Sequence, residues 1–333
     1  MRIVVDAMGS DNCPVPDVEG AVLAAREFRD TIILVGDQHK IDLELSKFNT
    51  SGLSLEIIHA SQTILMTDKP SFVGKDKPNS SMHIGLNLVK DKHAEAFVTA
   101  GNTGAALAIA TLFTLRRIRG VKRPALVSIL RLPENRSVIM LDIGANADTK
   151  PEWLFQFGIM GGIYAEKIGH ISSPRIALLS NGEEEGKGNQ LVIETGEILK
   201  NSHLNYIGNI EPKDILGGGA DVIVTDGFVG NIAIKSFEAM GSALSNLIRH
   251  ELKRNLISQL GGLIALPAFR RVSKQIDPYE IGGAPLLGVN GVVIIGHGRS
   301  NAGAIKNAIR QARLAVSGGI ISAIESGLDN TSA

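Results

Sequence analysis

Asparagine and glycine follow five short apolar runs in this 333-residue chain, and a stretch of helical character comes after each of them. Turns of this composition leave backbone N–H groups unpaired where a helix begins. Those donors, together with the helix dipole, favour an anion such as phosphate. We therefore expect a site for a small anionic group, built from the loops at residues 101–104, 142–146, 181–189, 226–231 and 296–301.

Side-chain donors are more numerous in these loops than turns require. A single Asn–Gly turn is usually structural, because both residues tolerate a positive φ. Five such turns, all placed after apolar runs, favour a functional site instead. The candidate side chains are Asn102, Thr103, Asn146, Asn181, Asn189, Asn231, Asn290, Arg299 and Ser300.

The loop at residues 181–189 also carries charge, with Glu183, Glu184 and Glu185 close to Lys187. Three carboxylates repel an anion unless they face away from it or meet cations. A solvated helix start is the alternative explanation for them. We expect Lys187 to be the anion ligand. A magnesium site is the less favoured alternative, because the spacing matches no known ligand pattern, and we expect neither metal nor cofactor.

Apolar runs without strict alternation predict strands that are buried on both faces. Helical patterns separate most of them, which is typical of a mostly parallel, doubly wound α/β sheet. The predicted strands are residues 3–6, 32–36, 55–59, 96–99, 126–130, 138–143, 176–180, 221–225 and 292–296. The predicted helices are residues 17–28, 105–115, 150–168, 190–200, 232–253 and 304–315. Thr149 and Glu152 predict a capping box for the third helix, with Pro151 in its first turn.

Loops at the carboxyl ends of parallel strands gather at one edge of a sheet. All five Asn/Gly loops follow predicted strands, so we expect them to share that edge. No repeat or charged linker divides the chain. We expect a single domain over residues 1–333, with two lobes around a cleft.

Charge and cysteine content exclude several classes of protein. Lys and Arg number 34, as do Asp and Glu, so the net charge is zero and argues against a nucleic-acid binder that relies on bulk positive charge. Cys13 is the only cysteine, which excludes an intrachain disulfide and a cysteine-based zinc site and fits a reducing cytoplasm. The first residues read as a strand rather than an export signal. No serine-hydrolase elbow or Walker A motif occurs.

Seven motifs occur in order over nearly the whole chain: residues 6–11 (DAMGSD), 99–105 (TAGNTGA), 142–146 (DIGAN), 179–189, 226–231 (DGFVGN), 285–291 (PLLGVNG) and 297–300 (HGRS). Together they resemble the PlsX-type phosphate acyltransferases. Ser10 is a small departure, since the family has glycine there; its side chain would matter only where the backbone approached a ligand closely.

The resemblance implies an enzyme that moves a fatty acyl group from acyl carrier protein to inorganic phosphate, giving acyl phosphate for phospholipid synthesis. A glycerol-3-phosphate acyltransferase would act downstream. The resemblance also implies a homodimer with the three-layer α/β/α fold of phosphotransacetylases and isopropylmalate dehydrogenases. Two alternatives stay open: a phosphotransacetylase-like enzyme that uses coenzyme A, and a non-catalytic scaffold on a membrane surface.

Phosphate can attack a thioester without a strong general base, so the enzyme must supply position, positive charge and donors for an oxyanion. We expect His297 to be either an acid–base group or a structural histidine. For phosphate binding we assign Gly101, Asn102, Thr103, Gly104, Arg299 and Ser300, together with Lys187. For contacts to the thioester or oxyanion we assign Asn146, Asn181 and Asn231, with Asp226 orienting the amides.

Residues 244–274 form a second feature, with apolar residues at helical spacing between basic flanks. The uncharged stretch 255–269, which we expect Gly261 and Gly262 to break, is too short for a bilayer span of about 20 residues. We expect an amphipathic helical hairpin on the inner face of the cell membrane of a cytoplasmic protein. A dimer interface and a dock for the acidic carrier protein are the alternatives. The contact residues would be Arg249, Lys253, Arg254, Leu256, Leu260, Arg270, Arg271 and Lys274.

Overall fold

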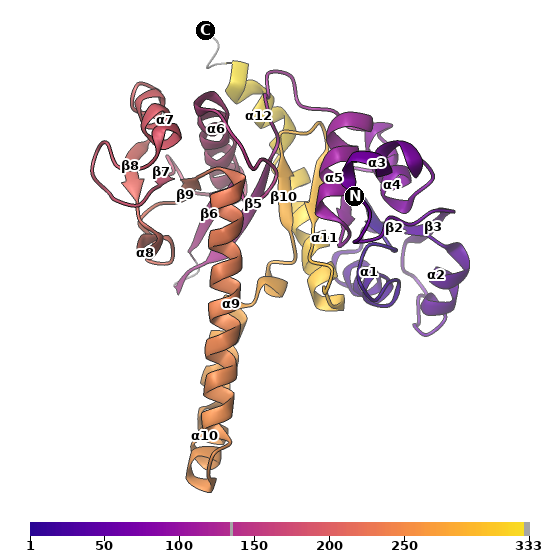
Figure 1. Ribbon diagram of the computed structural model, residues 1–333. Coiled ribbons are helices and arrows are strands. Elements are labelled where there is room, and N and C mark those ends of the chain that lie inside the picture. The colour runs from indigo at the N-terminus through magenta and orange to yellow at the C-terminus, as the bar shows by residue number, and fades with distance from the viewer. Residues whose placement is uncertain (134–135, 330–333) are drawn as a thin grey trace.

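Eleven strands form one continuous sheet in the computed structural model, which describes residues 1–133 and 136–329, without the side chains of residues 273–276 and 278 (Figure 1). The order across the sheet is β3-β2-β1-β4-β11-β10-β5-β6-β9-β7-β8. The strands are β1 Arg2–Asp6, β2 Thr31–Gly36, β3 Leu55–His59, β4 Ala96–Thr99, β5 Ala125–Arg131, β6 Ser137–Leu141, β7 Ile176–Leu179, β8 Tyr206–Ile210, β9 Val222–Val224, β10 Ala284–Leu287 and β11 Val292–Ile295. Each predicted strand is present, whereas β8 and β10 were not predicted.

Helices cover both faces of this sheet. They are α1 Val15–Phe28, α2 Gln38–Leu45, α3 Pro70–Asp76, α4 Ser81–Lys90, α5 Thr103–Ala108, α6 Pro151–Lys167, α7 Gln190–Lys200, α8 Pro212–Ile215, α9 Gly227–Leu252, α10 Leu256–Ile276, α11 Ala302–Ser317 and α12 Ile320–Asp329. A π-helical turn, η1 Ile109–Phe113, continues α5, and a 3-10 turn, η3 Pro278–Glu280, precedes β10. All the predicted helices are present.

Side chains of the strands alternate between the two helical layers. Ile3 and Val5 of β1 join a core with α1, α6, α11 and α12, whereas Val4 joins a second core with α4 and α5. On that second face, β6, β7 and β9 pack against α8 and α9. The result is the predicted three-layer α/β/α arrangement, with strands that are apolar on both sides.

Two half-sheets point in opposite directions. Strands β1–β4 and β11 are parallel and form the first half-sheet. Strands β6–β9 are parallel and form the second. Between them, β10 is antiparallel to both β11 and β5, and β5 is antiparallel to β6. The expectation that all five loops share one edge is therefore wrong: two follow the first half-sheet and three leave the opposite edge.

Helix α6 begins at Pro151, one residue after its predicted start at Lys150, and it lacks the predicted capping box. Lys150 is the N-cap and makes no side-chain cap hydrogen bond, while Pro151 occupies the first turn as expected. The hydroxyl of Thr149 is buried and has no hydrogen-bond partner within the described chain. The prediction failed because the helix starts one residue later than the Thr149–Glu152 spacing requires.

Helices α9 and α10 form the predicted hairpin, which extends away from the body of the molecule (Figure 1). The chain reverses at residues 253–255, and α10 continues through Gly261 and Gly262, so the expected break there is wrong. A Cβ on Gly262 would lie 3.1 Å from Leu252 Cδ2, so the missing side chain lets the two helices approach closely. Among the described residues, no helix is long and apolar enough to cross a membrane.

Ser10 turns its hydroxyl into the interior. Its Oγ donates a 2.5 Å hydrogen bond to Oδ2 of Asp17, on the first turn of α1, and both side chains are buried. Burial raises the pKa of Asp17 to about 8, because the charged form loses its hydration. The serine at the family's glycine position is thus part of the core rather than of an exposed loop surface.

Asp17 should make the stability of the protein depend on pH. Its raised pKa means that the folded state keeps a proton that the unfolded chain has already lost above about pH 4. This contribution to stability is complete below the unfolded pKa and is lost as the pH rises through about 8. Urea unfolding at pH 5 and pH 7.5 should show a smaller pH dependence in Asp17→Asn than in the wild type. Equal pH dependence in the two proteins would mean that Asp17 is ionised in the native state.

Candidate active site

Three adjacent strands of the second half-sheet end at the same level. Leu141 of β6 and Leu178 of β7 both pair with Val224 of β9. Because neighbouring strands lie about 4.8 Å apart, the loops that follow them begin side by side. We call the loops at residues 142–146, 181–189 and 226–231 the second cluster.

A corresponding group of loops follows the first half-sheet, where Val98 of β4 pairs with β1 on one side and β11 on the other. We call the loops at residues 7–11, 100–104 and 296–301 the first cluster. The buried carboxylate of Asp6 orders the first two of these loops: it accepts from the Met8 N–H at 3.2 Å and from Thr99 Oγ1 at 2.8 Å. Thr99 Oγ1 in turn accepts from the Gly101 N–H at 2.9 Å. Burial raises the pKa of Asp6, which these hydrogen bonds oppose.

Helix α9 connects the two clusters. Near its start, Asn231 Nδ2 donates to the carbonyl of Ile143 at 3.0 Å, in the second cluster. Two turns later, Glu238 Oε1 lies 3.5 Å from His297 Nε2, in the first cluster. At 1.5 Å per residue, the step of seven positions from Asn231 to Glu238 spans about 10 Å. Residues from both edges of the sheet thus contact the same helix within about two turns.

The side chain of Asn146 stabilises the loop that contains it. Asp142, fully buried, accepts from the N–H groups of Gly144, Ala145 and Asn146 at 3.1, 2.9 and 2.7 Å. Burial raises the pKa of Asp142, and the hydrogen bonds from this loop oppose that shift. Asn146 Nδ2 donates to Asp142 Oδ2 at 2.8 Å and to the Pro124 carbonyl at 2.7 Å. Both hydrogens of its amide are used, so no donor remains for a substrate.

Asp226 and Asn231 hold the start of α9. Asp226 Oδ1 accepts from the N–H groups of Phe228 and Val229, which makes it a helix cap rather than a partner of the asparagine amides. Asn231 uses one amide hydrogen for the Ile143 carbonyl and keeps the other. It is therefore the side chain of this pair that can still donate to a substrate.

Two of the three glutamates of the loop at residues 181–189 meet cations, which is one of the two arrangements that we expected. Glu183 lies 3.0 Å from Lys213, and Glu185 lies 2.6 Å from Lys200. Lys187 is exposed and forms no ion pair with any described residue. Its charge is available to an anion.

Two asparagines at the ends of this loop differ in their roles. Asn181 is exposed, and its Oδ1 lies 3.5 Å from Ser180 Oγ, which leaves its amide hydrogens without a partner in the described chain. Asn189 Oδ1 caps α7 by accepting from the Val192 N–H at 3.0 Å. Asn290 precedes β11, so it lies at the far end of that strand from residues 296–301.

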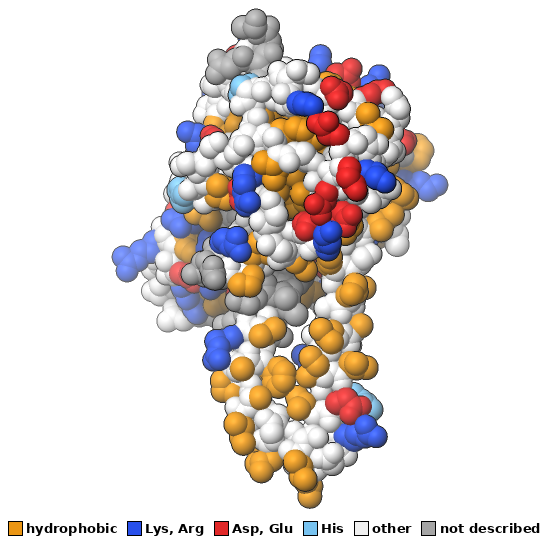
Figure 2. Space-filling view, turned by 90° about the vertical axis from the view of Figure 1, so that its left-hand side faces the viewer, with side chains coloured by type: hydrophobic (Ala, Val, Ile, Leu, Met, Phe, Trp, Pro, Cys, Tyr) orange, Lys and Arg blue, Asp and Glu red, His pale blue; other side chains and the backbone are white. Residues whose placement is uncertain are grey.

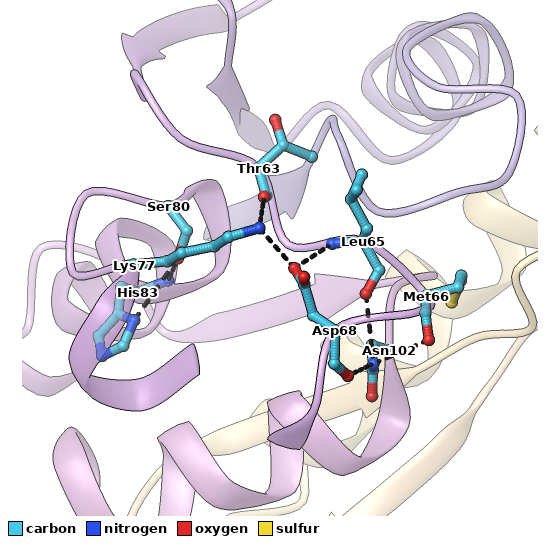
Figure 3. A network of polar contacts seen from close by, with 8 residues as sticks. All are labelled: Thr63, Leu65, Met66, Asp68, Lys77, Ser80, His83 and Asn102. Carbon is cyan, nitrogen blue, oxygen red and sulfur yellow. Dashed lines mark hydrogen bonds and ion pairs between the residues drawn. The ribbon is translucent and has the colours of Figure 1, made fainter. Parts of the chain in front are cut away.

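The turn at residues 101–104 opens helix α5. Asn102 is its N-cap and accepts from the Ala105 N–H at 3.1 Å, so the amides of Thr103 and Gly104 have no intrahelical partner. Asn102 Nδ2 donates to the carbonyls of Leu65, Met66 and Asp68 (Figure 3), and is occupied there rather than directed to a ligand. Thr103 is exposed.

Arg299 is the second cation available to an anion. It is exposed and has no ion pair among the residues that the structure describes. Ser300 is buried, and its Oγ has no hydrogen-bond partner in the described chain; it lies 3.3 Å from where a Cβ on Gly296 would be. The imidazole of His297 faces Glu238 and the ring of Tyr279.

Two parts of this site were not predicted. The turn at residues 65–68 packs over the first cluster, and no local sequence signal marks it. Lys235 lies on α9 between Asn231 and Glu238, four and three residues away, and therefore on the same flank of the helix. It is exposed and has no partner within the described ranges. Its position after the DGFVGN motif, at i+4 from Asn231, was the available signal.

No three His, Cys, Asp or Glu side chains gather as metal ligands in the part of the chain that the structure describes. The positively charged side chains at the two clusters are Lys187 in the second, Arg299 in the first, and Lys235 between them.

The hairpin carries a large exposed apolar surface (Figure 2). Leu256 is 82% exposed, Ile257 85% and Ile264 77%. The predicted basic residues Arg249, Lys253, Arg254, Arg270 and Arg271 are exposed as well, whereas the side chain of Lys274 lies outside the described ones. Arg254 pairs with Glu251 at 3.2 Å.

A family model described as a fatty acid synthesis protein matches residues 1–323. The phosphate acyltransferase of Dictyoglomus turgidum is 48% identical over 94% of this chain and 93% of its own length. That of Pelotomaculum thermopropionicum is 45% identical over 99% and 96%. These similarities run through both half-sheets and the hairpin.

Solved structures share the fold. A phosphotransacetylase from Streptococcus pyogenes has a TM-score of 0.61 at 20% identity, covering 98% of this chain and 94% of that one. A branched-chain phosphotransacylase from Enterococcus faecalis V583 has a TM-score of 0.59 at 15% identity, covering 95% and 99%. With the family model and the close relatives, the motifs place this chain in the PlsX-type phosphate acyltransferase family, acyltransferases of fatty acid and phospholipid synthesis.

Proposed function

We propose that this enzyme transfers a fatty acyl group from acyl carrier protein to inorganic phosphate and releases acyl phosphate. The observation that carries the proposal is the pair of cations without ion-pair partners in the described chain, Lys187 and Arg299, one in each cluster. Glu183 and Glu185, close to Lys187 in the sequence, are paired with Lys213 and Lys200 instead, so both free cations can meet a dianionic substrate. Family membership supports transfer of an acyl group to phosphate.

In the proposed reaction, a phosphate oxygen attacks the thioester carbonyl carbon and a C–O bond forms. The carbonyl oxygen becomes an oxyanion, which the free amide hydrogens of Asn181 and Asn231 stabilise. Collapse of the intermediate breaks the C–S bond and releases the carrier thiolate, which takes a proton from solvent. Arg299, Thr103 and the amide of Gly104 hold phosphate, and Lys187 offsets its charge.

The hairpin belongs to a second part of the proposal. We propose that its apolar side chains enter the surface of the inner membrane leaflet while its basic residues meet anionic lipid headgroups. We also propose that the enzyme forms a homodimer and that it delivers acyl phosphate to a glycerol-3-phosphate acyltransferase. Carrier-protein docking and dimer contacts are the competing uses of the same surface.

Arg299→Ala should raise the phosphate KM about tenfold or more, because one cation of the phosphate site is lost. Release of the carrier thiol from acyl-carrier thioester, measured against phosphate concentration, gives this value. Arg119→Ala, at another exposed arginine, is the matched control and should leave it unchanged. An unchanged phosphate KM in Arg299→Ala would remove Arg299 from the site.

The same assay separates the proposal from its alternatives. Faster turnover of acyl-CoA than of acyl-carrier thioester would favour a coenzyme A enzyme. Absence of phosphate-dependent thiol release with either donor would end the proposal of acyl transfer to phosphate.

Leu256→Glu should reduce flotation with liposomes of mixed anionic and neutral lipid several-fold, because a carboxylate at the hairpin end opposes burial among acyl chains. Leu43→Glu is the matched control, since Leu43 is 62% exposed on α2 of the main body. Equal flotation of Leu256→Glu and the wild type would discard membrane binding through the hairpin.

A further inference from the structure

Both polar atoms of the Asn102 side chain form hydrogen bonds. Its Nδ2 donates to the carbonyls of Leu65, Met66 and Asp68 at 3.3, 3.2 and 3.0 Å (Figure 3). Its Oδ1 caps α5 by accepting from the Ala105 N–H. An N-cap needs only the oxygen. The amide nitrogen therefore has a separate role, because capping does not require it. It fastens the turn at residues 65–68 to the start of α5.

A lysine fastens the same turn at a different place. Lys77 Nζ donates to Asp68 Oδ2 at 2.5 Å and to the Thr63 carbonyl at 2.9 Å, and Asp68 Oδ2 also accepts from the Leu65 N–H at 2.8 Å (Figure 3). The hydrogen bond from Lys77 lowers the pKa of Asp68. The turn is thus held both by the Asn102 amide and by this ion pair.

The fastened segment touches both glycine turns of the first cluster. A Cβ on Gly298 would lie 2.7 Å from Met66 Cε, and a Cβ on Gly104 would lie 2.6 Å from Pro70 Cγ. Glycine at these two positions lets the segment lie directly against the loops that carry Thr103 and Arg299. Displacement of residues 65–70 would open one side of the first cluster.

We propose that Asn102 is a positioning residue, which holds the turn at residues 65–68 as a wall of the phosphate site without contacting phosphate. This inference rests on the proposed function, which places phosphate at the first cluster. Leu65 and Met66 in this turn are 55% and 42% exposed, so the wall is apolar although it adjoins the proposed anion site.

Asn102→Ser separates the two roles of the side chain, because serine is as good an N-cap as asparagine but lacks the amide donor. We expect the phosphate KM to rise about tenfold, kcat to change less than threefold, and the melting temperature to stay within a few degrees of wild type. Hydrogen exchange measured by mass spectrometry should become faster at residues 62–69 but not in α5. Asn102→Asp, which keeps the cap but turns a carboxylate towards three carbonyls, should raise the phosphate KM further.

Lys77→Met tests the wall with Asn102 intact, and should likewise speed exchange at residues 62–69 and raise the phosphate KM. Asp37→Ser, at the cap of α2, is the control for altering an N-cap elsewhere and should change neither. Unchanged exchange in Asn102→Ser would overturn the fastening role. Faster exchange with an unchanged phosphate KM would overturn the positioning role while leaving acyl transfer intact. If the wild type showed no phosphate-dependent thiol release, the proposed function would be refuted, and this inference with it.

Discussion

Three successive antiparallel pairings, β11–β10, β10–β5 and β5–β6, determine where every functional loop can lie. Because their number is odd, the two parallel half-sheets on either side point in opposite directions, and their loops leave the sheet at opposite edges. A site that uses both sets of loops needs an element that reaches from one to the other. Helix α9 is that element, because it starts in the second cluster and meets His297 of the first through Glu238.

Many of the polar side chains near these loops hold the loops in place. The buried carboxylates are Asp6, the last residue of β1, and Asp142, the first residue after β6, and each accepts hydrogen bonds from the loop that follows. Such carboxylates cost desolvation energy, which the hydrogen bonds offset. The side chains left over for a substrate are few, chiefly Lys187, Arg299 and the amides of Asn181 and Asn231. A rigid site with few charges suits a nucleophile that is already anionic.

The sequence predicts the layers well and the site only partly. Apolar runs identify the central strands because burial on both faces leaves a strong signal. Strand β10 was not predicted because it contains Pro285, which cannot donate to a ladder and is unusual inside a sheet. The wrong expectation of a single shared edge arose because the antiparallel pairing of β5 with β6, like the two pairings of β10, was not recognised.

The sequence could not predict the roles of individual asparagines, for a different reason. Asn102, Asn189 and Asn301 each cap the helix that follows, as does Asp226, so local rules explain most of the polar surplus in the loops. Whether an amide is also free depends on distant carbonyls, such as those of Leu65 for Asn102 and Pro124 for Asn146. Those contacts exist only once the sheet has formed.

Helix α9 runs without interruption over 26 residues, from Gly227 to Leu252, and is about 39 Å long. One end carries Asn231 and the other lies in the exposed hairpin, so the two ends move as parts of a single stiff rod. A force applied to the hairpin is therefore transmitted along one continuous helix to Asn231 and the loops of the second cluster. The exposed hairpin and these loops are mechanically coupled in this architecture.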